Sequence, residues 1–286
     1  MKDVRMLLVG WLSVAALCAQ AGEVEPKVDE PSKKVATAPK LSDAARAAIG
    51  EARALAKASR GKNGPERARS LELAASAFDR CVARFEAEPR AAALAAWSAA
   101  ELWRRHGSLL LAEKDYLHAA SCDAPRYGQR GLLGAADMQR RQQRLEEAMK
   151  SYAAAEKVDP ATSRAQRARL WMARMLQSQD KIDAAIARFQ AALESAPSPR
   201  QAIDAADFLA KAWIVKGDLE SAGFVIEHAE KLVREHEDGD PIVAERLRRA
   251  CQRMSARKAL QRALDDKHDA AGDAVRLDEH RRKNGK

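Results

Sequence analysis

Arginine gives this sequence its most distinctive chemistry. The chain carries 50 Lys and Arg residues against 41 Asp and Glu, a formal net charge of +9 at pH 7. A guanidinium stays charged at every relevant pH and can bind a carboxylate through two parallel hydrogen bonds. The arginines of interest are Arg104, Arg105, Arg130, Arg140, Arg141, Arg167 and Arg174. Side chains of this type predict recognition of an acidic partner.

The sequence lacks the common catalytic and metal-binding patterns. Its six histidines are scattered, and none stands in an H-E-x-x-H or similar metal spacing. There is no G-x-S-x-G motif and no glycine-rich phosphate loop. The acidic stretch from Glu235 to Asp240 lacks the spacing of a calcium loop. We therefore predict that the protein is not an enzyme and needs no cofactor or metal.

The elements that position the arginines are predicted to be helices. The 286 residues are 47% hydrophobic, 5% aromatic and 32% charged, with only 14 glycines. This composition argues against a β-sandwich or barrel. The abundant Ala, Arg, Leu, Glu and Gln are strong helix formers. No apolar run reaches the roughly 18 residues of a membrane-spanning helix. We therefore expect an all-α protein.

The first 21 residues have the pattern of a signal peptide. Lys2 and Arg5 precede an apolar stretch, residues 6–19, that is too short to span a bilayer. Ala19-Gln20-Ala21 then provides the small-x-small pattern of a cleavage site. A lipoprotein anchored at Cys18 is the alternative, although Leu17 is a poor fit to the small residue expected there. The sequence thus predicts an exported protein, periplasmic or secreted.

Three cysteines remain after the predicted cleavage. Cys81, Cys122 and Cys251 are an odd number, so at least one thiol is free or pairs between molecules. None of them stands in a C-x-x-C motif or a Cys/His zinc spacing. Cys81 is interpreted as a small packing residue.

Prolines, glycines and charged residues mark the segments on either side of the central part of the chain. Residues 22–40 are interpreted as a flexible linker, because they combine prolines with Glu and Lys and show no periodicity. A helix and a loop are expected over 41–64. Asp240-Pro241 starts another helix. That basic helix is expected over 241–264, followed by a polar tail, residues 265–286, that need not fold.

An internal repeat lies between these segments. Ala74, Ala112, Ala148, Ala185 and Ala222 recur at intervals of 38, 36, 37 and 37 residues. Four residues after each stands Phe78, Tyr116, Tyr152, Phe189 or Ile226, and seven after each stands Cys81, Ala119, Ala155, Ala192 or Ala229. Spacings of three and four place these positions on one helix face. Twelve residues before the last four alanines stand Ala100, Ala136, Ala173 and Ala210.

This pattern resembles the tetratricopeptide repeat (TPR), a helix-turn-helix unit of about 34 residues. The resemblance implies an all-α solenoid with an extra helix at each end. The repeat units are expected over 66–89, 93–125, 129–160, 166–197 and 203–235. Residues 129–160 match best, whereas the first unit has Lys62 in place of the small first-helix residue. An antiparallel bundle whose alanines recur by chance is the alternative.

The resemblance also implies a binding surface, because the first helix of each TPR unit lines a concave groove. Family offsets place a set of residues in this groove: Trp97, Arg104, Arg105, Arg130, Leu133, Arg140, Arg141, Arg167, Leu170 and Arg174. Glu101 and Asp137 belong to the same row. The arginines are either a site for an acidic peptide or a solvated face paired with these acids.

One well-known TPR function is not expected of this chain. The family's carboxylate clamp, which holds the C-terminal tail of cytosolic chaperones, uses Lys and Asn at set first-helix positions. The asparagine positions here hold Glu101, Asp137 and Arg174. This departure, together with the predicted export, argues against binding of chaperone tails.

The sequence therefore predicts an exported, non-enzymatic TPR adaptor that binds an acidic or extended segment of another protein in the arginine-lined groove. The alternative is an envelope component that binds an anionic polymer or lipid through the basic helix 242–264. Its apolar residues, including Leu247, Met254, Leu260 and Leu264, could instead dock it as a solenoid cap. Nucleic acid is not an expected partner.

Overall fold

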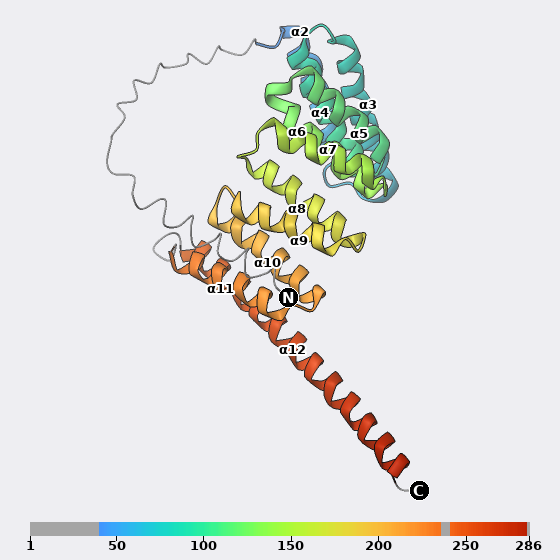
Figure 1. Cartoon of the computed structure of the whole chain (residues 1–286). Helices are drawn as coiled ribbons and strands as arrows, with labels where there is room; N and C mark the ends of the chain where they lie inside the picture. Colours follow the sequence, from blue (N-terminus) through green and yellow to red (C-terminus); the bar gives the residue numbers. More distant parts are fainter. Residues whose placement is uncertain (1–39, 236–240, 285–286) are drawn as a thin grey trace, which may run out of the picture. The chain divides into compact units, whose positions relative to one another are not determined.

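A computed structural model describes residues 40–235 and 241–284, with side chains except at 241–243, 246 and 270–284. The predicted signal peptide and all but the last residue of the predicted linker lie outside the described residues. Within the described part the chain is helical and contains no β-strand (Figure 1). None of its helices combines the length and the apolar character needed to cross a bilayer.

The helices follow one another through short connections. They are α2 (Asp43–Ala58), α3 (Gly64–Arg84), α4 (Pro89–His106), α5 (Leu109–Cys122), η1 (Ala124–Gly128), α6 (Gln129–Arg141), α7 (Leu145–Val158), α8 (Ser163–Ser178), α9 (Ile182–Glu194), α10 (Pro199–Lys216), α11 (Leu219–Glu235) and α12 (Pro241–Asn284). Proline occupies the first turn of α3, α4 and α10, where its missing N–H costs no helix hydrogen bond.

Neighbouring helices pack in series, and this makes the fold a solenoid. Each of the helices α2 to α11 packs against the next α-helix along the chain. First helices also contact one another, since α2 touches α4, α6 touches α8, and α8 touches α10. The helix predicted over 41–64 is therefore the first member of a hairpin with α3. The prediction of an all-α solenoid is confirmed.

The repeat positions form the core. Every residue of the predicted triplets is 5% exposed or less. The four first-helix alanines Ala100, Ala136, Ala173 and Ala210 are fully buried. These small residues let paired helices approach closely, while Tyr116, Tyr152 and Phe189 fill the space toward the neighbouring hairpin.

A left-handed residue ends the first helix of four successive hairpins. Gly107, Gln143, Asp180 and Gly217 have φ values of 100°, 62°, 57° and 84°. The amide that follows each of them bonds back to a carbonyl five residues earlier, as Arg144 N–H does to Gln139 O at 3.0 Å. This shared turn explains the constant distance between the two helices of a unit.

Helix α12 covers the last hairpin, where it contacts α10 and α11. Leu247, Cys251 and Met254 are 5% exposed or less, so this part of α12 closes the core. The expectation that Leu260 and Leu264 also dock the helix is wrong, because they are 62% and 51% exposed.

Helix α12 runs to Asn284, although a polar tail without a required fold was expected from residue 265. No proline follows Pro241, and the added residues are mostly good helix formers. Gln261 also donates a hydrogen bond to Asp265 one turn later, at 2.8 Å.

Candidate functional site

Five of the predicted groove residues surround one cavity. It has a volume of about 600 Å³, and α4, α6 and α8 provide most of its walls. Trp97, Arg104, Arg130, Leu133 and Arg167 line it. Its other lining residues are Glu101, Tyr116, Gly134, Asp137, Met138, Ser163 and Arg164. First helices therefore bring residues of three repeats together, as the groove hypothesis requires.

The charges in this 600 Å³ cavity are partly neutralised. Arg104 pairs with Glu101 at 2.8 Å, and Arg167 pairs with Asp137. Burial favours the neutral form of Glu101, but hydrogen bonds from Arg104 and the Tyr116 hydroxyl outweigh it and lower the pKa of Glu101. Of the two alternatives left by the sequence, pairing with local acids therefore applies to Arg104 and Arg167.

Arg130 lies in a different environment, between two aromatic rings. Its guanidinium carbon is 4.6 Å from the Trp97 ring centre and 3.7 Å from that of Tyr127. The π-helical turn η1 holds Tyr127, which is 5% exposed, beneath this guanidinium. Arg130 forms no ion pair with a carboxylate in the described part of the chain, and its buried Nε has no hydrogen-bond partner. Its charge is therefore held in place without being neutralised.

A row of alternating cations and rings, Arg140–Trp171–Arg174–Phe208–Lys211, extends along α6, α8 and α10. We call it the cation–aromatic row. The guanidinium carbons of Arg140 and Arg174 are 3.7 and 4.2 Å from the Trp171 ring centre. Arg174 and Lys211 lie 5.2 and 5.1 Å from that of Phe208. Neither arginine pairs with a carboxylate of the described residues.

The two arginines that share Trp171 affect each other's charge. Loss of water around its stacked side chain, followed by the positive charge of Arg140, lowers the pKa of Arg174. The buried Nε of Arg140 has no hydrogen-bond partner. Two like charges without an ion-paired carboxylate favour an anion at this position.

One repeated position explains why the two ends of the groove differ in charge. Glu101, Asp137, Arg174 and Lys211 follow one another at intervals of 36, 37 and 37 residues. Fifteen residues after each stands Tyr116, Tyr152, Phe189 or Ile226. The two tyrosine hydroxyls donate hydrogen bonds to the two acids. Phe189 and Ile226 have no such donor, and cations replace the acids beside them.

Two glycines let α6 approach α5 beside the cavity. A Cβ at Gly131 would lie 2.5 Å from the carbonyl oxygen of Tyr116, and one at Gly134 would lie 2.8 Å from the Tyr116 ring. These distances are far below ordinary contact, so both positions need glycine. Close approach here sets the position of Tyr116 under Glu101.

The remaining predicted residues lie elsewhere. Arg105 lines a separate cavity with the α2–α3 loop. Arg141 is exposed at the end of α6, and Leu170 is half-buried against the apolar core of the C-terminal repeats. Sequence reasoning missed the aromatic residues Tyr127, Trp171 and Phe208. Their spacing from the arginines was a usable signal, because Trp171 and Arg174 are three residues apart on one helix face.

Titratable groups outside the groove include a pair of carboxyl groups between α3 and α5. Burial, followed by the charge of Asp79, raises the pKa of Asp115 to about 8. Burial also raises the pKa of Asp79, although Trp103 Nε1 donates a hydrogen bond to it at 3.1 Å. Such a pair holds a proton at neutral pH.

Cys81, Cys122 and Cys251 are all free. Burial raises the pKa of each thiol, which favours the unreactive form. Cys122 Sγ lies 3.3 Å from His118 Nε2. The described residues contain no group of three or more His, Cys, Asp or Glu that could hold a metal ion.

No protein-family model and no curated protein matches the sequence. Among solved structures, the chain is similar to BtubC (BKLC) from P. vanneervenii, with 17% identity and a TM-score of 0.48 over 69% of this chain and 91% of that one. It is also similar to YrrB, described as a TPR protein with an unusual peptide-binding site, with 16% identity and a TM-score of 0.45 over 72% and 92%. A third is TTC0263, a TPR protein of Thermus thermophilus, with 18% identity and a TM-score of 0.39 over 72% and 98%.

Proposed function

We propose that this protein is an exported, non-enzymatic scaffold that binds an acidic segment of another protein along its first helices. The observation that carries the proposal is the state of Arg130, Arg140 and Arg174. Each is stacked on at least one aromatic ring, and none pairs with a carboxylate of the described residues. Such guanidiniums are oriented and charged before a ligand arrives.

Stacking favours binding for two physical reasons. A ring restrains the guanidinium, so less side-chain freedom is lost when a carboxylate binds. The ring also covers one face of the guanidinium and leaves its edge, which carries the N–H donors, free for bidentate hydrogen bonds. A carboxylate placed between Arg140 and Arg174 would in addition offset their mutual repulsion.

Arg104 and Arg167 have a smaller part in this proposal. Each already forms an ion pair inside the groove, with Glu101 or Asp137. An acidic ligand would have to displace that partner and leave a half-buried carboxylate without its counter-ion. We therefore assign ligand binding to the stacked arginines, while Arg104 and Arg167 stay in their ion pairs with the two acids.

The test compares two triple variants of the whole protein. One carries Arg130→Gln, Arg140→Gln and Arg174→Gln. The control removes the same charge from arginines that line neither cavity, Arg53, Arg69 and Arg234, all of which are exposed. Circular dichroism verifies the fold of both. Binding of a fluorescein-labelled peptide of alternating Glu and Leu is measured by anisotropy at low and at physiological salt.

We expect the stacked-arginine variant to bind the peptide at least about tenfold more weakly than wild type, because each lost charge-assisted hydrogen bond is worth about 1.5–3 kcal/mol. The control should stay within about threefold, the effect of net charge alone. Equal affinity of the two variants would refute the assignment. Capture from an envelope extract with the same three proteins would then identify the natural partner.

Export is tested separately. The proposal rests on residues 1–21, which predict cleavage after Ala21. Fractionation of cells that produce a C-terminally tagged protein, followed by N-terminal sequencing, should find a chain that starts at Gly22 outside the cytoplasm. A full-length chain in the cytoplasm would remove export from the proposal and leave peptide binding untouched.

The second candidate function is attachment to an anionic envelope polymer or lipid through α12. It is favoured by the exposure of Leu260 and Leu264, beside the exposed Arg253 and Arg262. Some other cations of this helix are already paired, as Arg257 is with Asp207 at 2.8 Å. Sedimentation with anionic phospholipid vesicles should be lost in a Leu260→Ser, Leu264→Ser double variant if this function is correct.

A further inference from the structure

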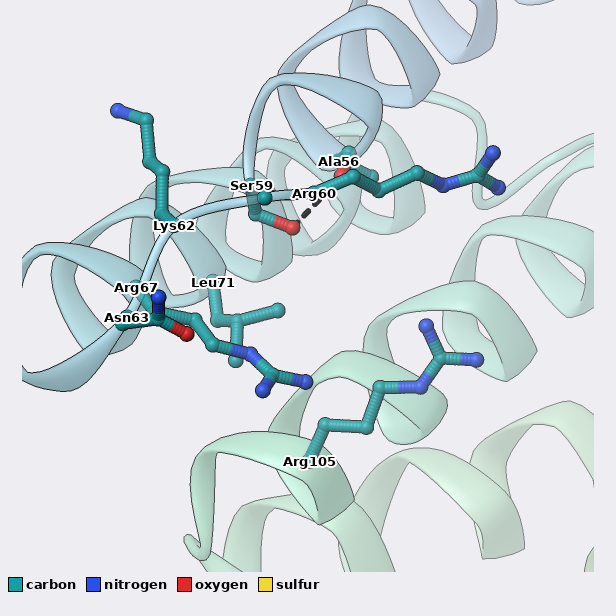
Figure 2. Close-up of a pocket in the computed structure, with 9 residues that line it drawn as sticks. Ala56, Ser59, Arg60, Lys62, Asn63, Arg67, Leu71 and Arg105 are labelled. Atoms are coloured by element: carbon teal, nitrogen blue, oxygen red, sulfur yellow. Dashed lines mark hydrogen bonds between the residues drawn. The ribbon is translucent and has the colours of Figure 1, made fainter.

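A second, smaller cavity carries positive charge that the proposed groove does not use. Its volume is about 320 Å³, and it lies where the α2–α3 loop meets α3 and the end of α4. The charged residues around it are Arg60, Lys62, Arg67 and Arg105 (Figure 2). It shares no lining residue with the 600 Å³ cavity. We call it the basic pocket.

The basic pocket contains cations without counter-ions. No Asp or Glu lines it. Lys62 is bonded to Glu66 at 2.9 Å. Arg60, Arg67 and Arg105, by contrast, form no ion pair with any carboxylate that the structure describes. Figure 2 shows the guanidinium groups of Arg67 and Arg105 extending into the same space from α3 and α4. Three unpaired charges in one hollow create a positive potential there.

The backbone around the pocket is well defined. Ser59 Oγ donates a hydrogen bond to Ala56 O at 2.7 Å and fixes the end of α2. Gly61 and Gly64 have φ values of 81° and 53°, which turn the chain from α2 into α3. Asn63 lines the pocket as the N-cap residue of α3, but its side chain makes no capping hydrogen bond. The positive end of α3 therefore lies beside the guanidiniums and adds to their potential.

We propose that the basic pocket binds a phosphate dianion, either inorganic phosphate or the phosphate group of an ester. The fork of a guanidinium matches two phosphate oxygens, and a tetrahedral group offers further oxygens to a second and a third arginine. A single carboxylate has only two oxygens and one charge, so it satisfies fewer of these donors. This site is independent of the peptide groove proposed above.

The test measures binding of inorganic phosphate and of O-phosphoserine to the whole protein by isothermal titration calorimetry at low ionic strength. Acetate is titrated as the monoanion control. The test variant carries Arg67→Gln and Arg105→Gln. A matched control carries Arg53→Gln and Arg69→Gln, which remove the same charge from exposed positions of α2 and α3 that do not line the pocket. A Lys version of the test variant keeps the charge.

We expect wild type and the matched control to bind phosphate alike, and the test variant to bind it about 10- to 100-fold more weakly. The Lys version should recover part of the affinity, since charge returns without the fork. Tighter binding of O-phosphoserine than of phosphate would identify an ester as the ligand, and the reverse would identify free phosphate. Equal loss in both Gln variants, equal affinity for acetate, or no binding at about 10 mM phosphate would each overturn the proposal.

Discussion

Replacing Gly131 by alanine tests the close contact between α5 and α6 that positions the groove. The new Cβ would lie 2.5 Å from the carbonyl oxygen of Tyr116 and 2.9 Å from the Cβ of Ala120. Neither neighbour is the end of a flexible side chain, so α6 must move away from α5. Gly50, in α2, provides the matched control, because a Cβ there meets nothing within 4 Å.

Two effects of opposite sign decide the result. Alanine favours a helix interior over glycine by about 0.5–1 kcal/mol, and this gain applies to both positions. Overpacking typically costs about 1–3 kcal/mol, and it applies to Gly131 alone. We therefore expect Gly50→Ala to stabilise the protein by about 0.5–1 kcal/mol and Gly131→Ala to destabilise it by about 1–2 kcal/mol.

Urea unfolding followed by circular dichroism gives both values under identical conditions. The difference between the two variants is the informative quantity, since the intrinsic helix propensity cancels in it. If Gly131→Ala were as stable as Gly50→Ala, α5 and α6 would not be in the close contact described, and the position of Tyr116 beneath Glu101 would lose its support.

Three further predictions concern titration, turns and the cap. The stability contribution of Asp115 should fall as pH rises from about 4 to about 8, because its folded-state pKa is raised from 3.8 to about 8 and the unfolded chain binds fewer protons in that range. Asp115→Asn should reduce this slope in urea midpoints measured across the range. Gln143→Gly should stabilise the protein by about 1 kcal/mol, since Gln143 has a φ of 62°. Gly107→Ala should destabilise it by a similar amount, as measured by thermal unfolding. Met254→Ala should cost about 2–5 kcal/mol, and Leu260→Ala less than about 0.5, because their exposures are 0% and 62%.

Each of these expectations has an outcome that contradicts it. An unchanged pH slope in Asp115→Asn would show that the buried proton is held elsewhere. Destabilisation by Gln143→Gly would mean that its side chain contributes more than its backbone strain costs. Equal effects of the two substitutions would show that Met254 does not lie on the docked face of α12.

The repeat pattern in the sequence is enough to predict the residues of the core. Spacings of three, four and twelve residues among small and large apolar residues are local features, and helix periodicity converts them directly into a buried face. All of these positions are buried in the structure. The sequence only implied the shared turn. Glycine favours a left-handed conformation, as at Gly107 and Gly217, whereas the residue types of Gln143 and Asp180 do not predict one.

Family offsets placed ten residues in one groove, and the structure places five of them, Trp97, Arg104, Arg130, Leu133 and Arg167, around one cavity. The sequence did not predict the electrostatic state of these residues. Whether an arginine pairs with an acid, as Arg167 does with Asp137, depends on residues 30 positions away on another helix.

The sequence by itself therefore determined which faces of the helices are buried and which carry charge, because those properties follow from periodicity along one helix. Only the tertiary structure decided which charges remain unpaired. The packing of α6 against α8 brings Arg140 to the ring of Trp171, over which Arg174 also lies. Arg105, near the end of α4, lines the basic pocket together with the α2–α3 loop. Pairing and stacking need atoms within a few ångströms, and the packing of helices distant in sequence sets those distances.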